Sequence, residues 1–227
     1  MKLVFDLDET LYNEYDFVLS GYREVSKLYS KLLNVDCDEV FAFMCHTHQL
    51  TGRKGILEAT YLYFAKRNLD DDLKQIVLNL YRYHNPMISI YPAAKNVLEK
   101  YAETGLALIT DGDAGVQTNK IRALGVEKYF RDIHTTWTYG QDKSKPSPFC
   151  FELTARNFGV EMSDLVYVGD DPHKDFLAVN NSGGITIRVL AGKYRLTQAQ
   201  GNLEATYSID SIGMLVGLFQ SNNILIA

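Results

Sequence analysis

The chain has 227 residues, of which 46% are hydrophobic and 22% charged, and its formal net charge is -5. This is the composition of an ordinary globular protein, long enough for one large domain or for a core with a smaller insert. The negative charge gives no general attraction to nucleic acid or to an anionic membrane, so we expect neither as a partner. No apolar run approaches a membrane span in length, and the N-terminus has no basic region followed by a long apolar one. Three scattered cysteines are too few for a disulfide framework or a zinc cage, and we expect a cytoplasmic protein.

The first predicted element is a short apolar strand, Leu3 to Phe5, which leads directly into Asp6 and Asp8. Side chains alternate along an extended segment, so both carboxylates point to the same side at the C-terminal end of the strand. Two carboxylates held close together repel each other, unless a cation lies between them or one of them stays protonated. The stretch therefore predicts a reaction centre or a metal site.

The segment 13–89 reads as a helical insert that is rich in tyrosine and has no strand signals. Its apolar residues recur at three- and four-residue spacing, as on amphipathic helices, and Asp36 followed by Glu39 is a capping box. The break at Asn85-Pro86 ends the insert. We expect helices at 15–33, from 36 through 44, at 56–67 and at 73–84, with a polar loop at 46–55.

Beyond residue 90, strands and helices alternate, which predicts an α/β fold with a doubly wound parallel sheet. The expected strands are 106–109, 132–136, 165–168, 185–189 and 207–209. One helix is expected to begin at Pro92. Four more are expected at 114–124, 147–158, 173–182 and 211–220.

Polar residues lie at the C-terminal ends of three of the predicted strands. They are Asp6 with Asp8, then Thr110, and then Asp170 with Asp171. In open α/β sheets this edge is where ligands bind, so we expect the three strand ends to converge on one crevice.

Four stretches in this order have the form of known motifs: Asp6-Leu7-Asp8-Glu9-Thr10, a strand ending in Thr110-Asp111-Gly112, Lys145-Pro146, and Gly169-Asp170-Asp171 with Asp175. Together they resemble the haloacid dehalogenase superfamily of hydrolases, in its phosphatase branch. The resemblance covers 1–17 and 91–189. It implies a Rossmann-like core formed by 1–12 and 90–227, with a small α-helical cap formed by 13–89.

The resemblance also implies an Mg²⁺-dependent phosphatase that works through an aspartyl-phosphate. Asp6 would be the nucleophile, while Asp8 would protonate the leaving oxygen and then deprotonate the attacking water. Thr110 would hydrogen-bond a phosphoryl oxygen, and Lys145 would balance negative charge on the nucleophile and the phosphate. Two further groups would help to bind the phosphate, the backbone N–H groups of Asp111 and Gly112.

In the family pattern, Mg²⁺ would be held by the carboxylates of Asp6 and Asp170 and by the backbone carbonyl of Asp8. Asp171 would be either a direct ligand or, like Asp175, a supporting group, and the sequence leaves this choice open. An acid at Asp175 is equally well explained as a favourable charge in the first turn of a helix.

Three residues of the insert, His46, His48 and Arg53, are the candidates for contact with the rest of the substrate. The two histidines lie near Cys45, but no matching ligand cluster accompanies them, so we expect no metal there. Substrate recognition by His48 and Arg53 is a hypothesis, and the tyrosines of the insert are interpreted as packing residues.

Three alternatives accompany the leading hypothesis. A phosphomutase of the same family keeps every motif and differs in its cap. A 2-haloacid dehalogenase uses the same nucleophile, but Asp8 and Asp170 would serve little purpose in it, and an inactive binding module conflicts with the full set of core groups. The expected partner is a small phosphorylated substrate, such as a sugar phosphate, a nucleotide or an organic acid phosphate. The sequence is compatible with a monomer or a homodimer.

Overall fold

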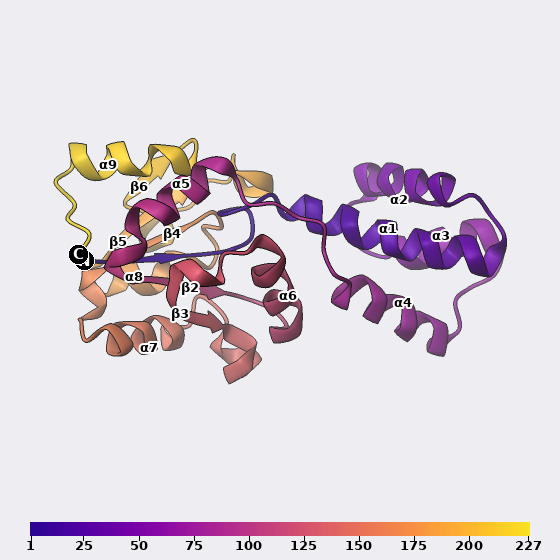
Figure 1. Ribbon diagram of the computed structural model, residues 1–227, viewed down its shortest axis with the longest axis horizontal. Coiled ribbons are helices and arrows are strands. Elements are labelled where there is room, and N and C mark those ends of the chain that lie inside the picture. Colours follow the sequence, from indigo (N-terminus) through magenta and orange to yellow (C-terminus); the bar gives the residue numbers. More distant parts are fainter. The chain divides into compact units, whose positions relative to one another are not determined.

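The computed structural model describes residues 1–227, which divide into two compact units. The first, here called the sheet unit, joins Met1–Glu14 to Ser89–Ala227. The second, the helical unit, is Tyr15–Ile88. All strands belong to the sheet unit, and the helical unit contains only helices and their connections (Figure 1).

The sheet unit is built on six strands in the order β3-β2-β1-β4-β5-β6. Every neighbouring pair is parallel, so the doubly wound parallel sheet expected from the sequence is confirmed. β1 lies in the middle, and the chain adds strands on one side of it before crossing to the other. The strands are β1 (Lys2–Phe5), β2 (Leu106–Thr110), β3 (Phe130–Thr135), β4 (Leu165–Gly169), β5 (Ile185–Val189) and β6 (Tyr207–Ile209).

Helices cover both faces of the sheet, with α5 and α9 on one side and α7 on the other (Figure 1). β2 and β4 are buried at every position, which explains why they read as continuous apolar runs instead of alternating ones. On the α7 face, Val4, Ile109 and Tyr167 pack in one cluster with Phe151. The helices of this unit are α5 (Pro92–Tyr101), α6 (Ala114–Leu124), α7 (Phe149–Phe158), α8 (Leu177–Asn181) and α9 (Leu215–Ser221).

The helix expected at 173–182 is wrong at its start, because α8 begins only at Leu177. The residues before it form turns, in which the Asp175 carboxylate accepts hydrogen bonds from the backbone N–H groups of Asp170 and Asp171. Side chains of this type compete with helical hydrogen bonding by offering the backbone a local partner. The helix expected at 211–220 likewise begins as a short 3-10 turn, Ile212–Met214, before α9.

The helical unit contains α1 (Glu14–Leu33), α2 (Cys37–Thr51), α3 (Ile56–Ala65) and α4 (Asp71–Tyr83), the first of which starts one residue before the unit. Tyrosines form much of its interior, since Tyr22, Tyr29, Tyr61 and Tyr81 belong to a single buried cluster. None of the helices in the structure is long and apolar enough to span a bilayer.

The polar loop expected at 46–55 is wrong in its first part, because α2 continues to Thr51 and only 52–55 form a loop. Asp36 caps the start of the helix by accepting the N–H of Glu39 at 2.9 Å, as the capping box predicts. The inward face continues past Met44 at four-residue spacing, and His48 is placed so that its Nδ1 lies 2.9 Å from the hydroxyl of Tyr22. The polar residues 46–51 therefore belong to the last turns of a helix, in which His48 is half-buried.

Candidate active site

The C-terminal ends of the neighbouring strands β2, β1 and β4 lie side by side at one edge of the sheet. Phe5, the last residue of β1, is in register with Leu108 of β2 and with Val168 of β4. The N–H of Asp6 then donates to the carbonyl of Val168 at 2.8 Å, which keeps the chain beside β4 for one more residue. This is the point where the strand order reverses direction, the usual ligand site of such sheets.

Lys145, in the segment before α7, contacts several side chains of this site. Its ammonium group lies 2.7 Å from Asp6 Oδ1 and 2.7 Å from Asp175 Oδ1, and it donates to the hydroxyl of Tyr167 at 2.9 Å. Burial alone would lower the pKa of Lys145, but Asp175 and Asp6 raise it well above its usual range. The lysine is therefore a fixed positive charge against the carboxylate predicted to be the nucleophile.

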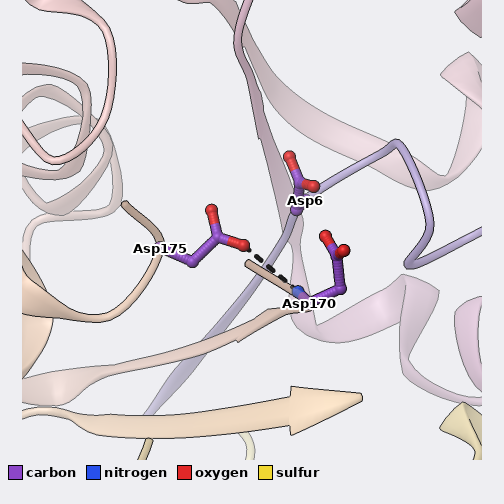
Figure 2. A group of neighbouring side chains, drawn as sticks. All are labelled: Asp6, Asp170 and Asp175. Atoms are coloured by element: carbon purple, nitrogen blue, oxygen red, sulfur yellow. Dashed lines mark hydrogen bonds between the residues drawn. The ribbon is translucent and has the colours of Figure 1, made fainter. Parts of the chain in front are cut away.

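Asp6, Asp170 and Asp175 form a buried acidic cluster whose ligand oxygens lie within 4.8 Å of one another (Figure 2). Burial raises the pKa of Asp6 to about 7, although Lys145 works against the shift. Burial, followed by the charges of Asp175 and Asp6, raises the pKa of Asp170 to about 9. The crowding of three buried carboxylates thus disfavours their charged forms, and a bound cation would offset this repulsion, which is the electrostatic setting of a cation site.

Asp175, and not Asp171, is the second acid of this cluster from the fourth motif. Figure 2 shows its carboxylate reaching the backbone nitrogen of Asp170, and its Oδ2 accepts N–H groups of Asp170 at 3.1 Å and of Asp171 at 2.9 Å. A Cβ at Gly169 would lie 2.5 Å from the same oxygen, so this approach requires a glycine there. The Asp171 carboxylate instead accepts the backbone N–H of His173 at 3.0 Å, and its Oδ1 lies 2.8 Å from the imidazole Nδ1 of that residue.

Thr110 lies at the end of β2 with 1% of its surface exposed, and its hydroxyl has no hydrogen-bond partner within the protein. A buried hydroxyl without a partner is costly, so its presence points to a partner that the protein alone does not supply. The next residues shape the turn: Gly112 has φ +120°, which favours glycine.

The Asp111 side chain is occupied by the protein itself. Its carboxylate accepts the Thr136 hydroxyl at 2.9 Å, the backbone N–H of Lys145 at 3.0 Å, and the ammonium of Lys174 at 3.2 Å. It therefore joins three segments of the sheet unit. A contact between substrate and the backbone N–H groups of Asp111 and Gly112 stays a prediction.

Asp8 is surrounded by three donors, none of which was predicted from the sequence. Its Oδ1 accepts from Lys120 at 2.7 Å and from the hydroxyl of Tyr12 at 2.5 Å, and its Oδ2 accepts from Gln117 at 3.0 Å. Burial works to raise the pKa of Asp8, but the charge of Lys120 and the three hydrogen bonds lower it to about 2. The only sequence signal was a polar pair, Gln117 and Lys120, three residues apart on the helix that follows Thr110.

His48 and Arg53 both belong to the helical unit. The His48 ring meets that of Tyr15 edge to face at 5.1 Å, and the Arg53 guanidinium lies 5.9 Å from the centre of the Tyr81 ring. Burial and the nearby Arg53 lower the pKa of His48. Their proposed contact with substrate stays a prediction.

The sequence matches the family described as haloacid dehalogenase-like hydrolase over residues 3–189. The chain belongs to this family. It is a hydrolase, and the resemblance drawn from its four motifs is confirmed.

Relatives within the family match the chain along nearly its whole length. It is 30% identical over 235 residues to a glyceraldehyde 3-phosphate phosphatase of Methanocaldococcus jannaschii, and the match covers 96% of each chain. It is 26% identical over 234 residues to the human N-acylneuraminate-9-phosphatase, covering 96% of this chain and 92% of the relative. Both relatives are named as phosphatases.

Solved haloacid dehalogenase-like structures share the fold. A family hydrolase from Deinococcus radiodurans, solved with bound phosphate and sodium, matches with a TM-score of 0.63 at 18% identity, over 100% of this chain and 98% of that one. A 2-haloacid dehalogenase from Pseudomonas syringae also matches with a TM-score of 0.63, at 20% identity, over 97% of this chain and 99% of that one. A phosphate-bound hydrolase and a dehalogenase match the chain equally well, so the fold alone does not distinguish phosphate-ester hydrolysis from dehalogenation.

Proposed function

We propose that the protein is an Mg²⁺-dependent phosphatase that hydrolyses a small phosphorylated metabolite through an aspartyl-phosphate on Asp6. The observation that carries the proposal is the buried acidic cluster of Asp6, Asp170 and Asp175 at the reversal point of the sheet, where Lys145 bridges Asp6 and Asp175. The phosphatase names of relatives that match nearly the whole chain support the same chemistry.

The residues of the cluster fit a magnesium ion. Carboxylate oxygens are the ligands that Mg²⁺ prefers, and the Asp170 carboxylate has no hydrogen-bond partner in the protein. Asp6, Asp170 and the backbone carbonyl of Asp8 would hold the ion, with Asp175 as a third carboxylate or as the group that orients Asp170. When bound, the ion supplies positive charge that offsets the repulsion between an attacking carboxylate and a phosphate dianion.

Asp6 would attack the phosphorus, and Lys145 and Thr110 would bind the phosphoryl group beside it. Lys145 occupies Asp6 Oδ1, which leaves Oδ2 as the oxygen that attacks phosphorus. The Thr110 hydroxyl, without a partner in the protein, would donate to a phosphoryl oxygen. Lys145 remains beside the phosphorylated Asp6 and balances the negative charge that gathers there.

Asp8 would move the proton in both half-reactions. As the Asp6 oxygen bonds to phosphorus and the bond to the leaving oxygen breaks, the proton of Asp8 passes to that oxygen. Asp8 is then a carboxylate, and it takes a proton from the water that hydrolyses the aspartyl-phosphate to inorganic phosphate. The hydrogen bonds around Asp8 favour its carboxylate form, so the first step requires it to gain a proton as the substrate dianion arrives.

Three-carbon sugar phosphates are the first substrates to test, because the relative with 30% identity is named for glyceraldehyde 3-phosphate. The three cysteines are free thiols, which fits the reducing cytoplasm that we propose as the location.

The test follows inorganic phosphate released from glyceraldehyde 3-phosphate, with Mg²⁺ and with a chelator. We expect release only with Mg²⁺, and a loss of at least ~10³-fold in Asp6→Asn, because the nucleophile is removed. Asp210→Asn, which neutralises an exposed carboxylate on the same unit, is the control and should keep full activity. Activity that survives the chelator or Asp6→Asn contradicts the mechanism, and an isomerised sugar phosphate without released phosphate identifies a mutase.

A further inference from the structure

The second aspartate of the first motif is held by side chains from a distant part of the chain. Lys120 and Gln117 both lie on α6, more than 100 residues beyond Asp8, and donate to its two carboxylate oxygens at 2.7 Å and 3.0 Å. They are three residues apart, so they project from the same face of the helix. Tyr12, on the loop after β1, completes the set of donors.

The contact between Lys120 and Asp8 is too buried to be an incidental surface ion pair. Only 4% of the Lys120 side chain is exposed, against 22% of the Asp8 side chain. Removing a lysine from water costs several kcal/mol unless a partner compensates, and the Asp8 carboxylate supplies such a partner to the buried Lys120. The Asp8 side chain is the more exposed of the two, as expected for the residue that would contact the substrate.

Gln117 connects Asp8 to the turn after β2 that is predicted to bind the phosphoryl group. Its Nε2 donates to Asp8 Oδ2 and also to the backbone carbonyl of Asp111. Asp111 follows Thr110 directly, so a single side chain sets the separation between the acid and the turn predicted to bind the phosphoryl group. A group that transfers a proton in the transition state is effective only when this separation is fixed within a fraction of an ångström.

We propose that Lys120 and Gln117 are positioning residues that hold Asp8 in line with the leaving oxygen of the substrate. This inference rests on the proposed function and names residues of the same site. Lys120 also neutralises the carboxylate that Asp8 becomes once its proton has passed to the leaving oxygen. Lys120 acts through its ion pair with Asp8, and Gln117 acts through its hydrogen bonds to Asp8 and to the backbone of Asp111.

The role predicts a dependence on the leaving group that a merely structural role does not produce. An alkyl phosphate, such as glyceraldehyde 3-phosphate, expels a strongly basic oxygen that has to be protonated as it leaves. An aryl phosphate, such as 4-nitrophenyl phosphate, expels a weakly basic oxygen that needs little help. The value of kcat/KM reports the steps up to the first irreversible one, the departure of the leaving group, and it excludes the later attack of water.

The experiment therefore compares kcat/KM for these two esters in Lys120→Met, Gln117→Leu and wild type. We expect Lys120→Met to lose at least ~10-fold more kcat/KM with the alkyl ester than with the aryl ester, and Gln117→Leu to lose in the same direction. Lys120→Arg, which keeps the charge and a donor, should recover part of the difference. Arg122→Met, which removes an exposed cation from the same helix, is the matched control and should leave the ratio unchanged.

The ratio of the two values is taken on one preparation, so it does not depend on how much of a variant is folded. If Lys120→Met gives no folded protein, Gln117→Leu carries the test, because it introduces no uncompensated charge. Asp8→Asn provides the upper limit of the effect, and Asp6→Asn should abolish turnover of both esters. An unchanged ratio in Lys120→Met or Gln117→Leu, with a raised ratio in Asp8→Asn, overturns the positioning role and leaves the proposed function intact. Turnover that persists in Asp6→Asn overturns the proposed function instead.

Discussion

Thr110 offers a test of the phosphate pocket at the scale of a single atom. Its hydroxyl is buried and has no partner, so Thr110→Val removes an oxygen that makes no bond in the free protein. We expect the free energy of unfolding to stay the same or to rise by up to about 1 kcal/mol. We expect kcat/KM to fall by ~10- to 100-fold, since a hydrogen bond to a charged phosphoryl oxygen is worth roughly 1.5–3 kcal/mol.

Urea unfolding and steady-state kinetics on the same samples measure the two effects. Thr110→Ser restores the hydroxyl and should restore most of kcat/KM. Wild-type kcat/KM in Thr110→Val would show that the hydroxyl does not bind phosphate. A lower free energy of unfolding in this variant would show that the hydroxyl already makes a hydrogen bond in the free protein.

The residues of the site differ in how far the sequence predicted them. Asp6, Thr110, Lys145 and Asp170 follow from motifs, because each lies at a strand end or beside one and parallel strands end at the same edge. The partners of Asp8 do not follow, because Lys120 is 112 positions away and only the packing of α6 brings it there. Tyr167 was not predicted for another reason: its ring occupies an ordinary core position of β4, and its contact with Lys145 is not visible in the sequence.

At the scale of the element, apolar spacing located most helices and strands, and local side-chain bonds caused the errors. Spacing predicts α1 well, because its buried residues repeat with the helical period. It misplaces the end of α2, since the last turns of this helix are polar and only half-buried at His48. It also starts α8 too early, because the Asp175 carboxylate bonds the preceding backbone. Polar residues that pack or form local hydrogen bonds therefore limit how accurately apolar spacing places the ends of helices.

Gly21 tests the packing of two of these elements, α1 and α4. A Cβ at Gly21 would lie 2.6 Å from Cδ2 of Tyr81, whose ring is held between Phe17 and Tyr22. We expect Gly21→Ala to lower the free energy of unfolding by roughly 1–3 kcal/mol through overpacking, although alanine is the better helix former by about 1 kcal/mol.

Gly217 in α9 is the matched control, because a Cβ there would meet nothing within 4 Å. Gly217→Ala should raise the free energy of unfolding by about 0.5–1 kcal/mol. Urea denaturation of both variants measures the difference. If Gly21→Ala is as stable as Gly217→Ala, the close approach of α1 to Tyr81 is not what requires a glycine.

At the scale of the whole molecule, the two units should respond to pH in opposite directions. In the helical unit, His84 is 5% exposed, its Nδ1 donates to the carbonyl of Tyr81 at 2.8 Å, and its buried Nε2 has no partner. Burial lowers the pKa of His84 below 6.5, although Glu24 and the Tyr81 carbonyl oppose the shift. Below pH 6.5 the unfolded chain therefore takes up a proton before the folded one, and the unit loses stability as the pH falls.

In the metal-free sheet unit the sign is reversed, because the raised pKa values belong to acids. Asp6 and Asp170 ionise near 3.8 in an unfolded chain, but at about 7 and about 9 in the folded one. Below 3.8 both states hold the protons, and their contribution to stability is complete. As the pH rises, the unfolded chain loses its protons first, so the contribution declines until the folded pKa values are reached.

Between pH 5 and pH 6.5, acidification should therefore destabilise the helical unit and stabilise the metal-free sheet unit. Hydrogen exchange in the presence of a chelator, corrected for the pH dependence of intrinsic exchange, follows both units in one sample. His84→Gln should flatten the trend of the helical unit, and Asp170→Asn should weaken that of the sheet unit. Mg²⁺ should protect the sheet unit more as the pH rises, because protons compete with the ion for Asp6 and Asp170. Parallel trends in the two units would show that these buried groups do not govern the pH dependence of the fold.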